Sequence, residues 1–188
     1  MTILIVGVLI WIGVHLVPVL ARPLRQSLID RLGKSGYRGI FSLTAVAAIV
    51  VIVFGWQAAP QVYLFALPPP VNGLAFVLIC ISFVLIGAAN HPSSIKRYIR
   101  HPMLLGVAIW ALSHVLLNGM TRDLVLFGGI GAWALIEIVL INRRDGAYTK
   151  PESPSFSEEL RGMFISAGVL LLVMFLHPYF TGVVAFPH

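Results

Sequence analysis

Four ionisable side chains lie inside long apolar stretches of this sequence, and they are the first candidates for chemistry. They are His15, His114, Glu137 and His177. An ionisable group in the hydrocarbon core of a membrane is costly, so its presence there favours a functional site. His15 and His114 fall on different stretches, each among aromatic and aliphatic residues. Two histidines arranged in this way could hold a flat apolar ring system such as heme through axial coordination.

A purely structural role stays open for each of these side chains. Either histidine could hydrogen-bond to a Ser, a Thr or a backbone carbonyl of a neighbouring helix. Glu137 lies about one turn before a basic pair, where it could reach water or bond Trp133 or a neighbouring histidine. His177 lies near the end of its stretch and is expected at the membrane interface. The lone Cys80 excludes an intrachain disulfide and a CxxC metal or redox site.

The composition indicates that lipid surrounds the segments that carry these residues. Hydrophobic residues make up 59% of the chain and charged residues only 11%, whereas soluble domains carry about 25% charged residues. A helix needs roughly 20 apolar residues to cross the hydrocarbon core. The predicted spans are Thr2–Leu20, Ile40–Ala58, Val71–Ala89, Pro102–Asn118, Leu124–Asn142 and Gly162–Val184. We therefore predict an all-α fold, a polytopic transmembrane bundle of six helices in a single domain over residues 1–188.

The distribution of basic residues predicts the orientation of this bundle. Of the 13 Lys and Arg residues, five lie in the first predicted loop, three in the third and four in the fifth, and only Arg122 lies in an even-numbered loop, beside Asp123. Short loops rich in Lys and Arg stay in the cytoplasm, so both termini are expected on the non-cytoplasmic side. The first span lacks a basic n-region and an A-x-A-like cleavage site, so we interpret it as retained. A basic cytoplasmic face favours the headgroups of membrane lipids as partners, and no nucleic acid is needed to explain the charge.

Several short motifs spread over the chain carry a resemblance to a known family. They are Gly13-x-His15-x-x-Pro18, Gly33-x-x-Gly36-Tyr37-Arg38, Ser42-Leu43, Arg100-His101-Pro102-Met103-Leu104-Leu105-Gly106, Trp110-Ala111-Leu112-Ser113-His114 and Asn118-Gly119. Together they resemble the NnrU family of bacterial membrane proteins, which is associated with denitrification and nitric oxide metabolism. That family is similar to plant and cyanobacterial 15-cis-zeta-carotene isomerase, a heme b enzyme. The resemblance implies a multi-pass protein of the bacterial inner (cytoplasmic) membrane, with denitrification or electron-transfer proteins as partners.

The same resemblance implies heme b as cofactor and indicates its ligands. In the isomerase these are a histidine on an early helix and the histidine of a Trp-Cys-Leu-Ala-His motif, and the matching positions here are His15 and His114. The cysteine of that motif matches Ala111, so heme binding follows more directly than heme-dependent cis–trans isomerisation of a carotenoid-like polyene, which stays an alternative. Whether the chain is an enzyme is left open. The expected neighbours of the ring are Trp11 and Trp110 for packing and Arg38, Arg97 and Arg100 for the propionates.

The depths of the two histidines provide a check on this pairing. His15 lies seven residues before Arg22, roughly 10 Å from the cytoplasmic boundary, and His114 lies thirteen residues after His101, roughly 20 Å along its helix. The two depths agree better if the fourth helix begins outside the membrane, near Ser94.

A second resemblance points to a different enzyme class. Arg100-His101-Pro102 with Gly106 also looks like the entry motif of membrane methyltransferases that use S-adenosylmethionine, and the pair Glu158-Glu159 would be the matching acids. That function predicts a nucleoside-sized polar pocket bounded by His101 and one of the two glutamates. The last cytoplasmic loop, residues 143–161, could be an ordered lid or a flexible link.

Overall fold

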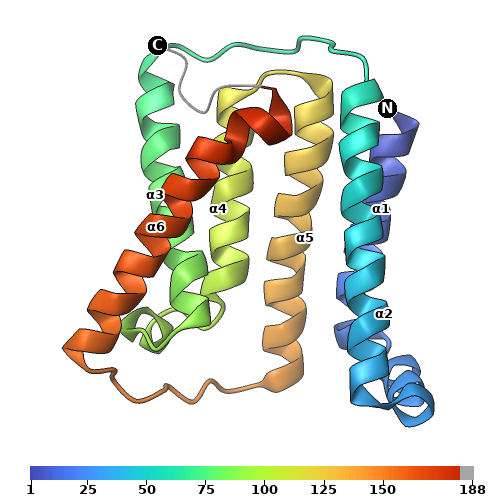
Figure 1. The fold of residues 1–188 in the computed structure, drawn as a ribbon, viewed down its shortest axis with the longest axis vertical. Coiled ribbons are helices and arrows are strands. Elements are labelled where there is room, and N and C mark those ends of the chain that lie inside the picture. Colours follow the sequence, from blue (N-terminus) through green and yellow to red (C-terminus); the bar gives the residue numbers. More distant parts are fainter. Residues whose placement is uncertain (183–188) are drawn as a thin grey trace.

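The computed structural model describes residues 1–182, which form six long α-helices and one short 3-10 turn (Figure 1). The elements are α1 (Thr2–Leu20), α2 (Arg22–Ala58), α3 (Pro70–Asn90), the turn η1 (Ser94–Arg97), α4 (Pro102–Leu117), α5 (Thr121–Asp145) and α6 (Phe156–Thr181). The predicted all-α fold and transmembrane bundle are confirmed. Residues 183 and 184, which end the last predicted span, and the remainder of the predicted domain up to residue 188 lie outside the described residues.

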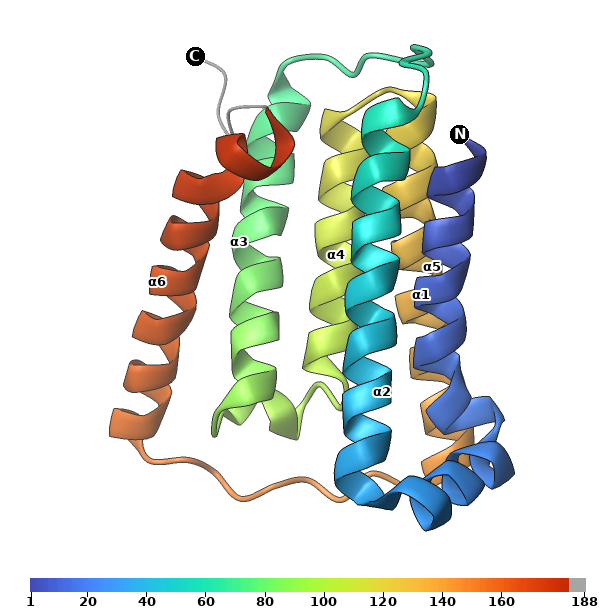
Figure 2. The same ribbon diagram turned by 45° about the vertical axis from the view of Figure 1, so that its right-hand side comes forward.

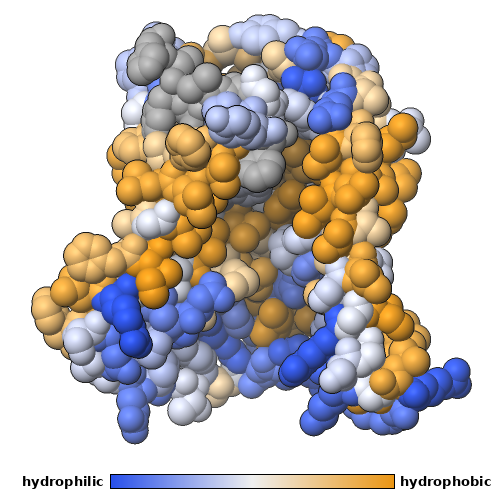
Figure 3. Space-filling model, in the orientation of Figure 1, coloured by the Kyte–Doolittle hydropathy of each residue, from blue (hydrophilic) through white to orange (hydrophobic). Residues whose placement is uncertain are grey.

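The helices suit a bilayer in length and in surface. Five of them, all except α4, are long and apolar enough to cross a membrane, and α4 with its 16 residues is about 24 Å long. Large apolar side chains cover the outward faces, for example Leu43 at 72% exposure and Phe164 at 70%. Figure 3 shows an apolar band across the middle of the molecule, with hydrophilic residues gathered toward its lower end. Lipid is the solvent that such a surface requires.

Helix α2 begins at Arg22, well before the predicted start of the second span at Ile40. The prediction of a loop there was wrong, because the charged segment is rich in Leu and Arg, which favour helix, and Pro23 suits a helix start. Gly33 interrupts the helix with a φ of 71°, a conformation that glycine adopts without strain. The segment before Gly33 therefore turns across the end of the bundle (Figure 2).

Helix α5 is central to the arrangement because it packs against both α1 and α4. Helix α1 also packs against α2, and α3 packs against α4 and against α6, which crosses it obliquely (Figure 1). The contact between α1 and α2 is close. A Cβ atom on Gly7 would lie 2.8 Å from the backbone nitrogen of Ile52, and Gly55 approaches the backbone of Leu4 in the same way. Small residues permit helices in a membrane to approach to this distance.

A buried polar cluster joins α2 and α5 at the end opposite to the basic loops. The indole Nε1 of Trp56 donates to Oδ1 of Asp123 at 2.9 Å, and the guanidinium carbon of Arg122 lies 3.8 Å from the centroid of the Trp56 ring. Arg122 is 8% exposed and Asp123 4%. We call these three residues the outer cluster. A β-bridge between Tyr63 and Met120 lies at the same end, so the height of α5 relative to α2 is fixed there.

Candidate functional site

His15 lies on α1 inside a cage of aromatic side chains from three helices. The centroid of its ring is 4.1 Å from that of Trp11 on the same helix, 4.9 Å from that of Trp133 on α5 and 5.2 Å from that of Phe41 on α2. Its Nδ1 is 2.8 Å from the backbone carbonyl oxygen of Trp11, one turn earlier. A carbonyl oxygen only accepts hydrogen bonds. In the neutral ring Nδ1 therefore carries the hydrogen and Nε2 carries the lone pair.

His114 has the same local arrangement on α4. Its Nδ1 is 2.9 Å from the carbonyl oxygen of Trp110, and its ring centroid is 4.6 Å from that of Trp110 and 4.5 Å from that of Phe127 on α5. Within residues 1–182, neither histidine hydrogen-bonds to a Ser, a Thr or a carbonyl of another helix. Both side chains thus present Nε2, the nitrogen with which a histidine binds a metal when its Nδ1–H bonds a carbonyl.

The two histidines contact α5 at different heights. His15 lies against Trp133 and His114 against Phe127. These two α5 residues are six positions apart, which corresponds to about 9 Å along the helix axis. The structure therefore brings both histidines to one helix, but at two levels of it.

The start of α4 does not remove this difference in height. A smaller difference in depth was expected if the helix began near Ser94, but Ser94–Arg97 forms the separate 3-10 turn and α4 begins at Pro102. Ser93 caps the turn with its side chain, and His101 has a non-helical backbone with a φ of −122° and a ψ of 64°. Pro102 suits this helix start, because a backbone N–H in the first turn would have no partner within the helix and proline has no N–H.

Three buried polar atoms, two on the tryptophans that contact His15 and one on Glu137, have no hydrogen-bond partner within residues 1–182, and the same holds for five other side-chain atoms there. The three atoms are Nε1 of Trp11, Nε1 of Trp133 and Oε2 of Glu137, and we call these three residues the inner cluster. Trp133 is 6% exposed. Glu137 follows it by one turn on α5, with its carboxyl group close to the indole but outside hydrogen-bond geometry. An unpaired buried polar group costs roughly 1–3 kcal/mol, so three of them together indicate a site that a ligand or water completes.

The three arginines expected at heme propionates have different surroundings. Arg97 donates to the hydroxyl of Ser153, and Arg100 donates to the carbonyl oxygen of Gly146 at 2.6 Å. Both side chains connect the loop between α5 and α6 to the segment before α4. Arg38 is exposed and makes no hydrogen bond or ion pair within the described part of the chain.

The residues expected of a methyltransferase have structural partners. His101 Nε2 lies 3.0 Å from Oδ1 of Asn142. Glu158 caps the start of α6, and Glu159 accepts a hydrogen bond from the backbone nitrogen of Ser94 at 2.8 Å. A pocket of about 190 Å³ between α3 and α6 includes Glu159 but not His101, and most of its lining is apolar. Neither of the two pockets found among the described residues is bounded by both His101 and one of the glutamates.

The position that matches the isomerase cysteine serves the contact between α4 and α5. Ala111 is 1% exposed, and a Cβ atom on Gly131 would lie 3.2 Å from the Cβ of Ala111. This side chain is enclosed by the neighbouring helix, which gives no support to a redox-active role at that position.

Three members of the aromatic surroundings were missed from the sequence, namely Phe41, Phe127 and Trp133. Their contacts depend on which faces α2 and α5 turn to their neighbours. A signal for Trp133 is nevertheless present. Glu137 follows it by four residues, the same spacing that separates each histidine from its own tryptophan.

The comparisons with known proteins agree with the resemblance carried by the motifs. The family model described as NnrU protein matches residues 3–185. No curated protein and no solved structure matches the chain.

Proposed function

The chain belongs to the NnrU protein family, and from this membership we propose that it is a heme b-binding protein of the bacterial inner membrane that serves denitrification or nitric oxide metabolism. Nε2 of His15 and Nε2 of His114 bind the iron. The metabolic role and the partners, denitrification or electron-transfer proteins, rest on the family resemblance. The heme rests also on the geometry of the two histidines.

One observation carries the proposal. Each histidine bonds the carbonyl oxygen one turn earlier through Nδ1, at 2.8 Å for His15 and 2.9 Å for His114. This bond fixes the ring and leaves Nε2 with its lone pair, as in metal-binding histidines whose other nitrogen is held by a carbonyl. The same bond would also satisfy the N–H of a packed histidine, so the support lies in the lone pair that Nε2 keeps in both rings.

The inner cluster gives independent support on the side of His15. Two indole N–H groups and a carboxyl oxygen lie there without partners, although the surrounding structure is well packed. Imidazole nitrogens among aromatic side chains fit a flat apolar macrocycle. Polar atoms at the edge of the macrocycle, or ordered water, would accept hydrogen bonds from the unpaired indole N–H groups.

The difference in height between the histidines sets a requirement on binding. One iron held by both nitrogens needs them about 4 Å apart, because metal–imidazole bonds are roughly 2 Å long. His15 and His114 contact α5 about 9 Å apart along its axis. One iron held by both histidines would therefore require α1 and α4 to shift relative to each other along α5.

Heme, when bound, would supply electron transfer or gas binding, and His15 and His114 would be the residues that hold it. The residues of this chain orient the ligand rings through the Nδ1–carbonyl bonds. The aromatic side chains around His15 and His114 exclude water from the same space.

The test is the visible spectrum of the detergent-purified protein from heme-replete cells, oxidised and reduced with dithionite. The native chain should show a Soret band and sharp bands on reduction. His15→Gly and His114→Gly should each lose most of this absorbance, and added imidazole should restore part of it. His101→Ala is the matched control, since its ring contacts Asn142 at the basic end, and it should keep the native spectrum.

The outcomes separate the possibilities. If both glycine variants lose the bands while gel filtration shows a native elution volume, one heme is held by both histidines. If only one variant does so, a single histidine binds the iron and the pairing is wrong. A colourless native protein from heme-replete cells would overturn heme binding altogether.

A further inference from the structure

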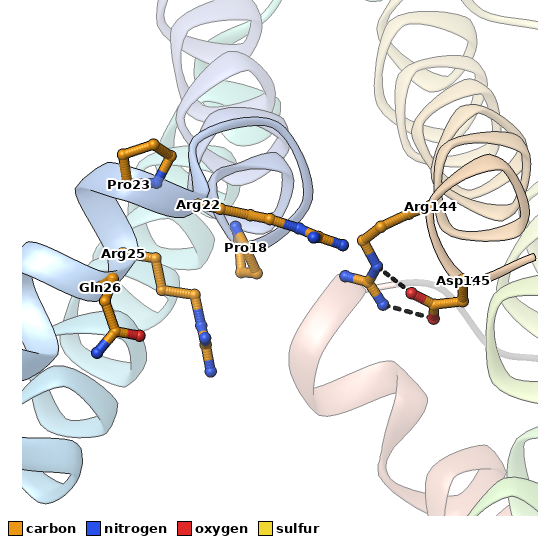
Figure 4. Close-up of a pocket in the computed structure, with 7 residues that line it drawn as sticks. All are labelled: Pro18, Arg22, Pro23, Arg25, Gln26, Arg144 and Asp145. Atoms are coloured by element: carbon orange, nitrogen blue, oxygen red, sulfur yellow. Dashed lines mark hydrogen bonds and ion pairs between the residues drawn. The ribbon is translucent and has the colours of Figure 1, made fainter.

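An open pocket of about 580 Å³ lies at the basic end of the bundle, where the turn between α1 and α2 faces the end of α5 (Figure 4). Three of its lining residues are arginines, namely Arg22 and Arg25 from α2 and Arg144 from α5. In Figure 4 the Arg22 side chain extends across the pocket toward Arg144. The pocket thus gathers guanidinium groups from segments that are far apart in the sequence.

Two of these arginines are held in place by neighbours. Arg144 donates to both carboxylate oxygens of Asp145, with its Nη2 at 2.7 Å. The guanidinium carbon of Arg25 lies 5.5 Å from the centroid of the Tyr37 ring. These two residues lie on either side of the bend in α2 at Gly33. Arg22 makes no hydrogen bond or ion pair within residues 1–182. Its donors are available to a ligand.

The charges in the pocket are unbalanced. Asp145 is its one lining acid, and it already accepts from Arg144 and lies 3.9 Å from Arg100. The next acid along α2, Asp30, accepts a hydrogen bond from Gln26. Three guanidinium groups around a carboxylate that is already shared leave a surplus of positive charge, and an anion stabilises such a surplus.

The surroundings identify the class of anion. Arginine forks bind phosphate with two parallel hydrogen bonds. Leu20 at 61% exposure and Leu24 at 52% flank the arginines, and α1 crosses the apolar band directly above them. Phosphate lies next to hydrocarbon in the headgroup region of a phospholipid. The basic end of the bundle is predicted to face the cytoplasmic leaflet, which is the leaflet that carries anionic lipids.

We propose that this pocket binds the phosphate of an anionic phospholipid between Arg22 and Arg144, with Arg25 elsewhere in the lining as a further positive charge. Tyr37 and Asp145 position their arginines for it. The bound lipid links the start of α2 to the end of α5, the two segments that flank the cytoplasmic side of the His15 cage. The site is independent of heme.

The experiment measures lipid binding to the detergent-purified protein by native mass spectrometry, with phosphatidylglycerol, phosphatidylcholine and inorganic phosphate as probes. The native chain should bind phosphatidylglycerol about tenfold more tightly than phosphatidylcholine. The double variant Arg22→Gln/Arg25→Gln should lose about tenfold in that affinity, because two of the three arginines that line the pocket are removed. The matched control, Arg31→Gln/Lys34→Gln, removes the same charge from the same segment outside the pocket, and it should lose less than about twofold.

The double variant also removes two of the positive charges that favour the cytoplasmic orientation of this segment. Arg144→Gln therefore provides a second variant, on the α5 side of the pocket. It should reproduce the loss. Equal losses in the pocket and control variants, or no loss with Arg144→Gln, would overturn the site. Displacement of phosphatidylglycerol by millimolar inorganic phosphate would keep the phosphate chemistry but overturn the lipid as its source.

Discussion

An indole lies next to a carboxylate at two levels of α5, but only one of these two pairs forms a hydrogen bond. In the outer cluster, Trp56 donates to Asp123 at 2.9 Å. In the inner cluster, the indole nitrogen of Trp133 and one carboxylate oxygen of Glu137 are buried without partners. Each pair consists of one buried residue, Asp123 at 4% exposure and Trp133 at 6%, and one half-buried partner, Trp56 and Glu137 respectively. The degree of burial therefore does not account for the difference.

The difference lies in which helices supply the two groups. Trp56 and Asp123 come from α2 and α5, so their hydrogen bond fastens one helix to another. Trp133 and Glu137 lie one turn apart on the same helix, where bonding each other would fasten nothing. The Trp56–Asp123 bond of the outer cluster stabilises the fold, although Nε of Arg122 in the same cluster is buried without a partner. The inner cluster has no such bond between helices, and we propose that a ligand completes it. Residue types alone do not separate these roles, but the pairing of their polar atoms does.

The largest expected effect comes from breaking the outer cluster. Asp123→Ala leaves the buried Trp56 N–H without an acceptor and removes the carboxylate next to the buried Arg122. We expect the free energy of unfolding to fall by about 3 kcal/mol, measured by SDS titration in mixed micelles. Glu152→Ala removes an exposed carboxylate and should change the free energy by less than about 0.5 kcal/mol. Equal effects of the two variants would show that the outer cluster contributes nothing to stability.

A smaller effect of opposite sign should distinguish the two indoles. Trp56→Phe and Trp133→Phe remove the same N–H group and keep most of the packing. The first should destabilise the ligand-free protein by about 1 kcal/mol because a hydrogen bond is lost. The second should be neutral or stabilising by a similar amount, because an unpaired donor disappears. Thermal unfolding followed by circular dichroism measures both, and a loss of stability in both variants would contradict the comparison.

The local part of the site could be predicted from the sequence, because it is formed within single helices. His15 and Trp11 are four residues apart, as are His114 and Trp110, and this spacing places each ring over its own preceding turn. The contacts of the two histidines with these tryptophans therefore follow from the spacing. The Nδ1–carbonyl bonds were not predicted, since bonds to a neighbouring helix were the alternative considered.

The part that could not be predicted depends on contacts between helices. The positions of Phe41, Phe127 and Trp133 against the histidines require the rotation of α2 and α5 about their axes, and apolar residues cover nearly all faces of a membrane helix. The contacts of Arg97 and Arg100 required the path of the loop after α5. A lone basic residue outside the basic loops, Arg122, was a usable signal for the outer cluster.

The same reasoning explains the outcome at the level of the fold. Six apolar stretches define the helices of the bundle because length and hydropathy suffice to recognise a span. Charge does not define a helix end, so the helical segment that follows Arg22 was assigned to a loop. Its bend at Gly33 reflects one glycine with a positive φ, which composition does not reveal.

The smallest expected effect tests the inner cluster directly. Glu137→Gln keeps the shape of the side chain, and Oε2 of the native carboxyl has no hydrogen-bond partner within residues 1–182. The free energy of unfolding of the ligand-free protein should therefore change by less than about 0.5 kcal/mol. If the proposed heme site includes this residue, transfer of heme to apomyoglobin should become faster by about fivefold, the equivalent of about 1 kcal/mol. A loss of stability as large as that of Asp123→Ala would show that Glu137 is structural, and the distinction between the two levels of α5 would then fail.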